Sequence, residues 1–380
     1  MSSLTQRTPE PRLQQIALAR QAILHDGESM SLTGTQAWIE RSWQRCLVSG
    51  KRPDEKVSFN IVAPNAMRHL IDSHQTLLNT ARPVLQSLAH AIASTRYFAI
   101  LTNAQGVVID AHGAIDRSDR RADLITRTGT DLSEHALATT SISAALSELQ
   151  PIWLHKGEHF YDANAVYSCA GSPLFGHDGV CIGMLDLTGI ETAERPELKH
   201  LVAQSARSIE NALTVGQLKT NGDLLIRLNW PGRTLGDETD GLVCLNADGY
   251  VTAANQMARM MVPQLIEWTE EQHASDLFAM PHDMLFDAAR RQSSKAALEV
   301  PLWTGLRLYA MPLMSSKLGN SSYEQMSASV AAPLPLKDIE TALIRKAVDE
   351  ARGNVQKAAK TLGVSRATVY RRLGAALKRS

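Results

Sequence analysis

Apolar residues near the C-terminus recur at the spacing of an amphipathic helix. Between Leu336 and Arg352 they return every three or four positions, so that they line one helical face. These positions are Ile339, Leu343, Ile344, Ala347, Val348 and Ala351. Glycine adopts the left-handed conformation that ends helices, and an asparagine side chain accepts a backbone N–H at a helix start. We therefore predict that Gly353 ends a first helix and that Asn354 caps a second.

The second and third predicted helices are short and close together. The second covers Val355–Leu362, and the third runs from Arg366 to about Leu377 with Ser365 as its cap. Apolar residues four positions apart give the third helix a buried stripe, made of Val369, Leu373 and Leu377. A turn at Gly363 joins the two helices, as in a helix-turn-helix. A plain three-helix bundle with a solvated face would show the same apolar pattern.

The distribution of charge separates these two interpretations. The whole chain is neutral, with 39 Lys and Arg against 39 Asp and Glu. Residues 354–380 contain no acidic residue and seven basic ones, namely Lys357, Lys360, Arg366, Arg371, Arg372, Lys378 and Arg379. Positive charge gathered on a small helical module is typical of a surface that neutralises phosphates. The sequence therefore favours a DNA-binding helix-turn-helix.

The stretch from Gly353 to Leu373, G-N-V-Q-K-A-A-K-T-L-G-V-S-R-A-T-V-Y-R-R-L, resembles the C-terminal module of Fis-type regulators. The resemblance implies that the module binds double-stranded DNA as a homodimer. It also implies DNA contacts at Asn354, Gln356, Ser365, Arg366, Thr368, Tyr370, Arg371 and Arg372. Arg366, in the first turn of the third helix, is placed to pair with a guanine, whereas Arg371 and Arg372 are placed to contact phosphates.

Further towards the N-terminus the apolar pattern changes to that of strands and hairpins. Residues 97–102 and 107–110 flank the turn Asn103-Ala104-Gln105-Gly106. Residues 167–174 and 180–188 flank the turn Gly176-His177-Asp178-Gly179. Between these hairpins, residues 129–134 lead into an apolar helix that is predicted to end near Leu149. The first 70 residues are predicted to be mainly helical, with Trp38, Trp43 and Leu47 on one helix face.

The stretch Ile39-Glu40-Arg41-Ser42-Trp43-Gln44-Arg45-Cys46 resembles the opening of regulators of acetoin catabolism and of the dihydroxyacetone-kinase operon. The likeness continues in order and spacing over roughly residues 35–215 and implies a GAF-like sensory domain. Its candidate ligand-pocket residues are Leu132, Glu134, Thr139, His159, Tyr167, Cys169 and Asp186. Leu132 stands where relatives commonly carry tryptophan, and Ala138-Thr139-Thr140 where they carry Gly-Thr-Asn. The effector of the relatives therefore cannot be assumed for this chain.

A second sensory unit is predicted after the GAF-like region. Residues 241–246 and 250–255 form a hairpin around Ala247-Asp248-Gly249 and lead into a helix over 256–261, an order that resembles the start of a PAS domain. Further strands are predicted over 297–302 and 306–313, although a generic α+β subdomain would also fit. The predicted fold is thus α+β, with antiparallel sheets flanked by helices, followed by an all-α helix-turn-helix. The predicted parts are a helical region 1–72, a GAF-like domain 73–220, a PAS-like domain 221–315, a linker 316–335 and a Fis-type module 336–380.

Three other patterns bear on the possible chemistry. His155-Lys156-Gly157-Glu158-His159 spells the H-x-x-E-H zinc-peptidase pattern, but Gly157 in a polar loop disfavours the helix that this pattern requires. Cys169 and Cys181 lie on adjacent predicted strands, either as a redox pair or as two buried thiols. The phosphate-binding pattern G-x-x-x-x-G-K-[ST] does not occur, so we expect none of the ATPase activity that acetoin-type regulators use. We predict no metal, no cofactor and no enzymatic activity.

The remaining sequence features indicate the compartment. The N-terminal residues lack the apolar core of a signal peptide, and no run of about 18 apolar residues is long enough to span a membrane. The four cysteines are scattered without C-x-x-C spacing, which is typical of a reducing compartment. We therefore expect a cytoplasmic transcription regulator whose sensory domains respond to a small molecule or a partner. The alternative is a regulator controlled by the docking of a signalling protein. Activation and repression both remain open.

Overall fold

The computed structural model describes residues 11–25, 37–267, 271–291, 297–317 and 355–356. The chain divides into two units, Met1–Ser327 and Ala328–Ser380, and the elements below belong to the first. The predicted helices of the DNA-binding module lie outside the described residues, apart from Val355 and Gln356. Among the described residues, no helix is both long and apolar enough to cross a membrane.

The first sheet contains five strands, all antiparallel to their neighbours, in the order β2-β1-β5-β4-β3. Its strands are β1 (Tyr97–Asn103), β2 (Val108–Gly113), β3 (Ile152–His155), β4 (Tyr167–Phe175) and β5 (Cys181–Ile190). The two predicted hairpins are present as β1–β2 and β4–β5. Each turns at a glycine with positive φ, 81° at Gly106 and 82° at Gly179, a conformation that residues with a Cβ rarely adopt.

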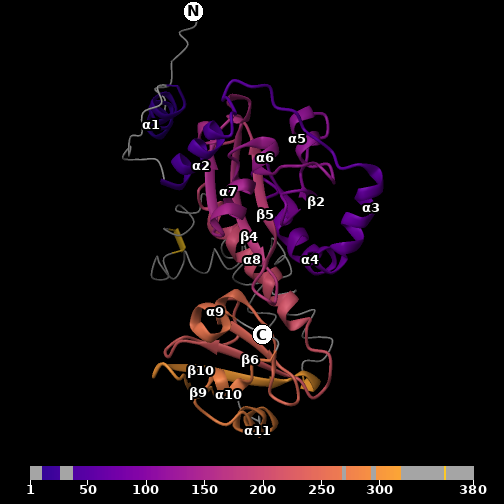
Figure 1. Cartoon of the computed structure of the whole chain (residues 1–380), viewed down its shortest axis with the longest axis vertical. Coiled ribbons are helices and arrows are strands. Elements are labelled where there is room, and N and C mark those ends of the chain that lie inside the picture. Colours follow the sequence, from indigo (N-terminus) through magenta and orange to yellow (C-terminus); the bar gives the residue numbers. More distant parts are fainter. Residues whose placement is uncertain (1–10, 26–36, 268–270, 292–296, 318–354, 357–380) are drawn as a thin grey trace, which may run out of the picture. The chain divides into compact units, whose positions relative to one another are not determined.

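Helices cover both faces of the first sheet (Figure 1). The helices of this half are α1 (Pro11–Arg20), α2 (Ala37–Val48), α3 (Pro64–Ser73), α4 (Gln75–Ala91), α5 (Arg120–Ile125), α6 (Glu134–Leu137), α7 (Ser141–Glu148) and α8 (Leu198–Val215), with a π-helical turn at Gln21–His25. α4 and α8 pack on one face of the sheet. α7 packs on the other face, where α2 joins the same hydrophobic core. Two separate layers of apolar side chains therefore hold the sheet.

The helix predicted to run on to Leu149 is instead two helices, α6 and α7. The break occurs at Ala138, which has a φ of 55° and so cannot continue an α-helix. Thr140 then caps α7, because its side chain accepts a hydrogen bond from the Ser143 backbone N–H at 3.2 Å, and Ser143 returns a bond to the Thr140 N–H at 2.9 Å. This break brings the first turn of α7 towards the sheet.

The second sheet also contains five antiparallel strands, in the order β8-β7-β6-β10-β9. Its strands are β6 (Leu224–Asn229), β7 (Gly241–Leu245), β8 (Val251–Ala254), β9 (Leu298–Pro301) and β10 (Arg307–Met314). Its helices are α9 (Gln256–Met261), α10 (Ala274–Leu277) and α11 (Asp283–Arg291). The hairpin, the helix after it and the two later strands match the prediction. The central strand β6 was not predicted.

β6 carries one member of a buried ion pair, Arg227, whose partner Asp240 directly precedes β7. The Arg227 guanidinium lies 3.0 Å from the Asp240 carboxylate, and the two side chains are 9% and 0% exposed. Asp240 also accepts hydrogen bonds from the Asn229 amide at 3.1 Å and from the Gly236 backbone N–H at 2.7 Å. Buried charges are tolerated where each is paired and hydrogen-bonded in this way. The pair therefore fixes the 230–240 loop to the centre of the sheet.

α8 carries a buried carboxyl group on the face that meets the first sheet. Glu210 is 6% exposed and accepts a hydrogen bond from the Phe175 backbone N–H at 2.9 Å. Burial raises the pKa of Glu210 to about 8, because removal from water disfavours the charged form. Glu210 is therefore mainly protonated at neutral pH.

Candidate ligand cavity

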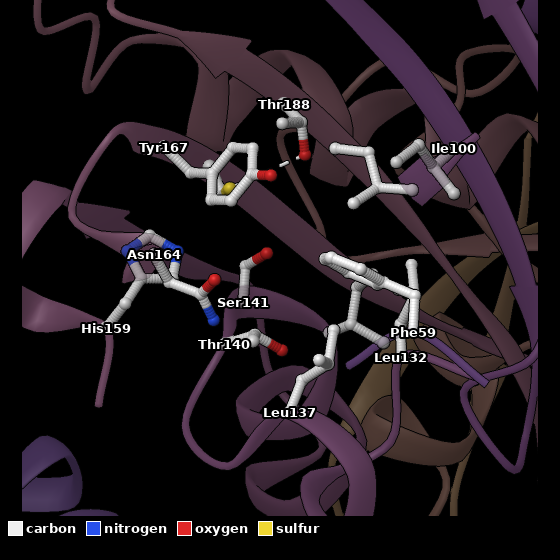
Figure 2. Close-up of a pocket in the computed structure, with 13 residues that line it drawn as sticks. Phe59, Ile100, Leu132, Leu137, Thr140, Ser141, His159, Asn164, Tyr167 and Thr188 are labelled. Atoms are coloured by element: carbon white, nitrogen blue, oxygen red, sulfur yellow. Dashed lines mark hydrogen bonds between the residues drawn. The ribbon is translucent and has the colours of Figure 1, made fainter. Parts of the chain in front are cut away.

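A cavity lies between the first sheet and the helices α5, α6 and α7, with about 380 Å³ of empty space that includes its opening to solvent. It is lined by Phe59, Ile100, Ile125, Leu132, Leu137, Thr140, Ser141, Ile142, His159, Asn164, Tyr167, Cys169 and Thr188. The lining is divided by chemistry (Figure 2): His159, Asn164 and Tyr167 lie on one side and Phe59, Leu132 and Ile100 on the other. A largely apolar cavity with a few convergent polar groups is the usual form of a small-molecule site.

A buried carboxylate, that of Asp186, lies behind two lining residues of the cavity, Ser141 and Thr188. Asp186 on β5 is 0% exposed and accepts hydrogen bonds from the hydroxyls of Ser141, at 2.5 Å, and Thr188. Burial raises the pKa of Asp186 to about 6, although the two hydroxyl hydrogen bonds oppose the shift by stabilising the charged form. Asp186 is therefore mainly ionised above pH 7, with both hydroxyls bonded to it.

His159 contributes a neutral imidazole to the cavity. The side chain is 1% exposed, and burial lowers its pKa to about 4. Its Nδ1 lies 2.9 Å from the Lys156 carbonyl oxygen. Because a carbonyl can only accept, Nδ1 carries the proton and Nε2 is left as an acceptor. Burial also raises the pKa of Tyr167, so its hydroxyl stays protonated at neutral pH.

Side chains from the N-terminal helices hold the loop that carries His159. The Arg20 guanidinium donates to the carbonyl oxygens of Gly157, at 2.8 Å, and Phe160, at 3.0 Å, and also to the carbonyl of His159. The Trp43 indole N–H donates to the Glu158 carbonyl at 3.0 Å. Four successive carbonyl groups of the loop are thus bonded by α1 and α2, which fixes this wall of the cavity.

The same loop contains the H-x-x-E-H pattern, and its conformation differs from that of a zinc peptidase. His155 ends β3, and Lys156–Glu158 form a single 3-10 turn instead of an α-helix. The Glu158 carboxylate is engaged elsewhere, since it accepts from the His155 backbone N–H at 2.6 Å and pairs with Arg12 at 2.8 Å. Among the described residues, no group of three or more His, Cys, Asp and Glu side chains is arranged to hold a metal ion.

The structure brings together four of the seven predicted pocket residues, since Leu132, His159, Tyr167 and Cys169 all line the cavity. Asp186 lies one hydrogen bond behind the lining, through Ser141 and Thr188. The other two predicted residues, Thr139 and Glu134, face α2, where each is hydrogen-bonded to the Ser42 hydroxyl. That any of the seven contacts a ligand stays a prediction.

Sequence reasoning missed Ser141 and Thr188, the two hydroxyls between Asp186 and the cavity. Thr188 had a local signal, because residues two apart on a strand face the same side of a sheet, as Asp186 and Thr188 do on β5. Ser141 depends on the break between α6 and α7, which the continuous apolar pattern concealed. Phe59 comes from a segment before α3, and no local pattern connects it with the cavity.

Cys169 and Cys181 are not a disulfide pair in this structure. Both thiols are free, and the register of β4 and β5 places Cys169 opposite Thr188 and Cys181 opposite Phe175. The two cysteines thus lie six residue pairs apart along the hairpin, which is roughly 20 Å at the usual rise per strand residue. This distance is too long for a disulfide, whose Cα atoms lie within about 7 Å.

Of the residues predicted to contact DNA, Gln356 is described, and it is helical and exposed. The others, Asn354, Ser365, Arg366, Thr368, Tyr370, Arg371 and Arg372, lie outside the described residues. Their predicted contacts stay predictions.

Two segments of the chain match known protein families. Residues 335–375 match the family described as bacterial regulatory protein, Fis family. Residues 16–211, just over half of the chain, match the family described as MimR, N-terminal domain. The chain belongs to the MimR N-terminal domain family. All the cavity-lining residues lie within the matched segment, so the cavity is a feature of this domain.

Several bacterial regulators are similar to the chain. The acetoin catabolism regulatory protein of Cupriavidus necator is 28% identical over 234 residues, which is 60% of this chain and 34% of that protein. The propane 2-monooxygenase operon transcriptional activator MimR of Mycolicibacterium smegmatis is 26% identical over 54% of this chain and 34% of its own length. The chain thus matches about a third of the length of these relatives. The predicted resemblance to acetoin-type regulators with a Fis-type module is confirmed.

Among solved structures, the crystal structure of the E. coli DhaR(N)–DhaL complex contains a chain similar to this one. The two chains are 14% identical, with a TM-score of 0.45, over 73% of this chain and 99% of that chain. The predicted fold class is confirmed by the structure itself, which has two antiparallel sheets flanked by helices.

Proposed function

We propose that the chain is a cytoplasmic, DNA-binding transcription regulator in which a small molecule in the cavity controls a Fis-type helix-turn-helix. The observation that carries this proposal is a lined cavity in a MimR-type domain on the same chain as a Fis-family module. We further propose that the protein acts as a homodimer. We also propose that each chain is divided into domains at the boundaries predicted above. It works without the ATPase step of its longer relatives and has no enzymatic activity of its own.

The lining of the cavity favours an uncharged effector. None of the described lining residues is lysine, arginine, aspartate or glutamate. The ionisable ones are His159, Tyr167 and Cys169, and burial shifts the pKa of each towards its neutral form. An ionic ligand would therefore lose its hydration without gaining a counterion in the lining, which is strongly unfavourable.

A direct route connects the cavity with the second sheet. β4 and β5 carry Tyr167, Cys169 and Thr188, and they end in the turn at 176–179. The carbonyl of His177 in this turn accepts hydrogen bonds from the Ala254 N–H at 2.9 Å and the Arg259 guanidinium at 3.0 Å. A ligand that shifts the hairpin would change these contacts, and control requires that it bind the two resulting arrangements with different affinity.

DNA binding by the purified full-length chain tests the proposal. Footprinting should locate an operator, and fluorescence anisotropy should show affinity that falls steeply with salt, because phosphate contacts release counterions. Arg366→Ala should reduce discrimination against a mismatched base by about 1–3 kcal/mol. Arg371→Ala should weaken binding to all sequences alike and reduce the salt dependence by about one ion.

The two variants are controls for each other, since both remove one positive charge from the module. Binding that is insensitive to salt, or a preference for sequence that both variants leave unchanged, would contradict the assignment of the C-terminal module as a DNA reader.

A further inference from the structure

Two hydroxyls in the lining of the cavity, those of Ser141 and Thr188, have a fixed direction of donation. Ser141 and Thr188 each possess one hydroxyl hydrogen, and each hydroxyl lies against a different oxygen of the Asp186 carboxylate. An ionised carboxylate can only accept hydrogen bonds, so both hydroxyl hydrogens point at Asp186. Neither hydroxyl has a hydrogen left to offer to the cavity.

Counting hydrogens also fixes the role of a third group at this end of the cavity, the Cys169 thiol. The Cys169 sulfur lies 3.4 Å from the Thr188 hydroxyl oxygen. Because the Thr188 hydrogen is used on Asp186, the Cys169 thiol is the donor in this pair. Burial raises the pKa of that thiol well above its usual value, so it retains its hydrogen. Donation into Thr188 leaves the thiol without a hydrogen for a ligand.

The cavity therefore presents lone pairs where Ser141 and Thr188 face it. His159 adds a further acceptor on the adjoining wall, since its Nδ1 proton is bonded to the Lys156 carbonyl. Tyr167 and Asn164 are the lining groups nearby that can still donate, and they lie on the His159 side (Figure 2). A bound molecule meets Ser141 and Thr188 as acceptors.

We propose that the cavity selects uncharged molecules that donate a hydrogen bond to the Ser141–Thr188 pair, such as alcohols, over ketones of the same shape. This rests on the proposed function, in which the cavity holds the effector. A hydroxyl group satisfies one of these acceptors on binding. A ketone oxygen in the same place can only accept, as can the Ser141 and Thr188 oxygens that it faces. The ketone oxygen and these two oxygens then form no hydrogen bond with one another. A buried polar group without a partner lowers affinity by about tenfold or more.

Two pairs of probes isolate the hydrogen-bond donor from size and shape. 2-Butanol is compared with 2-butanone, and cyclohexanol with cyclohexanone, in NMR titrations of the full-length protein at pH 8, where Asp186 is ionised. We expect the alcohol of each pair to bind at least about tenfold more tightly than the ketone.

Asp186→Asn tests the origin of that preference. An asparagine amide donates to one hydroxyl and accepts from the other, so one hydroxyl hydrogen becomes available to the cavity. The ratio of alcohol to ketone affinity should therefore fall towards one. Thr188→Val keeps the Asp186 side chain but removes one acceptor from the cavity and one hydrogen bond from the carboxylate. It should also lower the ratio, which keeps the test valid if the Asp186 variant does not fold. Glu210→Gln is the matched control, since it replaces a buried carboxyl group that is not part of the lining with an amide, and it should leave the ratio unchanged.

The outcomes separate this inference from the proposed function. Equal affinity for alcohol and ketone, or a ratio that both variants leave unchanged, overturns the donor selection while the cavity remains a ligand site. Binding by none of the four probes overturns the donor selection and the cavity's role as effector site together. DNA binding, measured separately, is unaffected by either result.

Discussion

Replacing Trp43 with alanine is expected to lower the free energy of unfolding by about 3–5 kcal/mol, the usual effect of truncating a fully buried aromatic residue. Trp43 is 0% exposed, and its indole N–H donates to the Glu158 carbonyl at 3.0 Å. The Arg20 guanidinium lies 5.7 Å from the centre of its ring. The variant thus loses packing, a hydrogen bond and a cation–π contact at once.

The same substitution should loosen the cavity wall that carries His159. Urea denaturation measures the free energy of unfolding. The rate of amide hydrogen exchange at residues 156–164 measures how firmly the loop that carries His159 is held. Trp303→Ala is the matched control, because Trp303 is 64% exposed and its indole N–H also donates to a carbonyl, that of Ser275 at 2.9 Å. An equal loss of stability in both variants, or unchanged exchange over the loop in Trp43→Ala, would contradict the role given to Trp43.

Asp240→Asn is expected to destabilise the second sheet by about 3–5 kcal/mol, the usual effect of removing one charged partner from a buried ion pair. Arg227 is 9% exposed on the central strand, 3.0 Å from Asp240. Its guanidinium also donates to the Asp237 carbonyl at 3.3 Å, which does not replace the lost charge.

Thermal and urea unfolding of the full-length chain measure this loss. The control is Asp287→Asn, which removes a carboxylate paired with Arg290 and Arg291 at 3.4 Å on the exposed side of α11. Exposed pairs contribute about 0–1 kcal/mol, so this variant should remain close to the wild type. A loss from Asp240→Asn no larger than that of the control would show that the buried pair does not hold the 230–240 loop.

Local patterns in the sequence predicted the hairpins correctly, because the signal for each lies within a few residues. The turns at Gly106 and Gly179 need a positive φ, and apolar strands flank both. The C-terminal module was predicted from the same kind of information, an apolar helical period combined with seven basic residues and no acidic one. Its resemblance to the Fis family is confirmed by the match over residues 335–375.

Long-range features were harder to predict. β6 contains an arginine that hydropathy treats as exposed, and its burial depends on Asp240, thirteen positions later in the chain. The break at Ala138 interrupts an apolar stretch that resembles one helix, because a backbone angle leaves no trace in hydropathy. The hydroxyls of Ser141 and Thr188 come together only when α7 packs on β5. The sequence therefore suggested their shared partner Asp186 but not the two hydrogen bonds that this carboxylate accepts.

The central claim is that the state of the cavity sets the affinity of the chain for DNA, and a larger side chain in the lining of the cavity tests it most directly. Leu132→Trp places an indole in the lining, while Val48→Trp adds the same group at a position that is 90% exposed. Affinity for the footprinted operator is measured for both variants and the wild type, after circular dichroism and melting temperature have shown that each variant is folded. We expect Leu132→Trp to change the affinity by at least about fivefold, the lower end of typical allosteric coupling, and Val48→Trp to leave it unchanged. A folded Leu132→Trp protein that binds the operator with wild-type affinity would contradict the account.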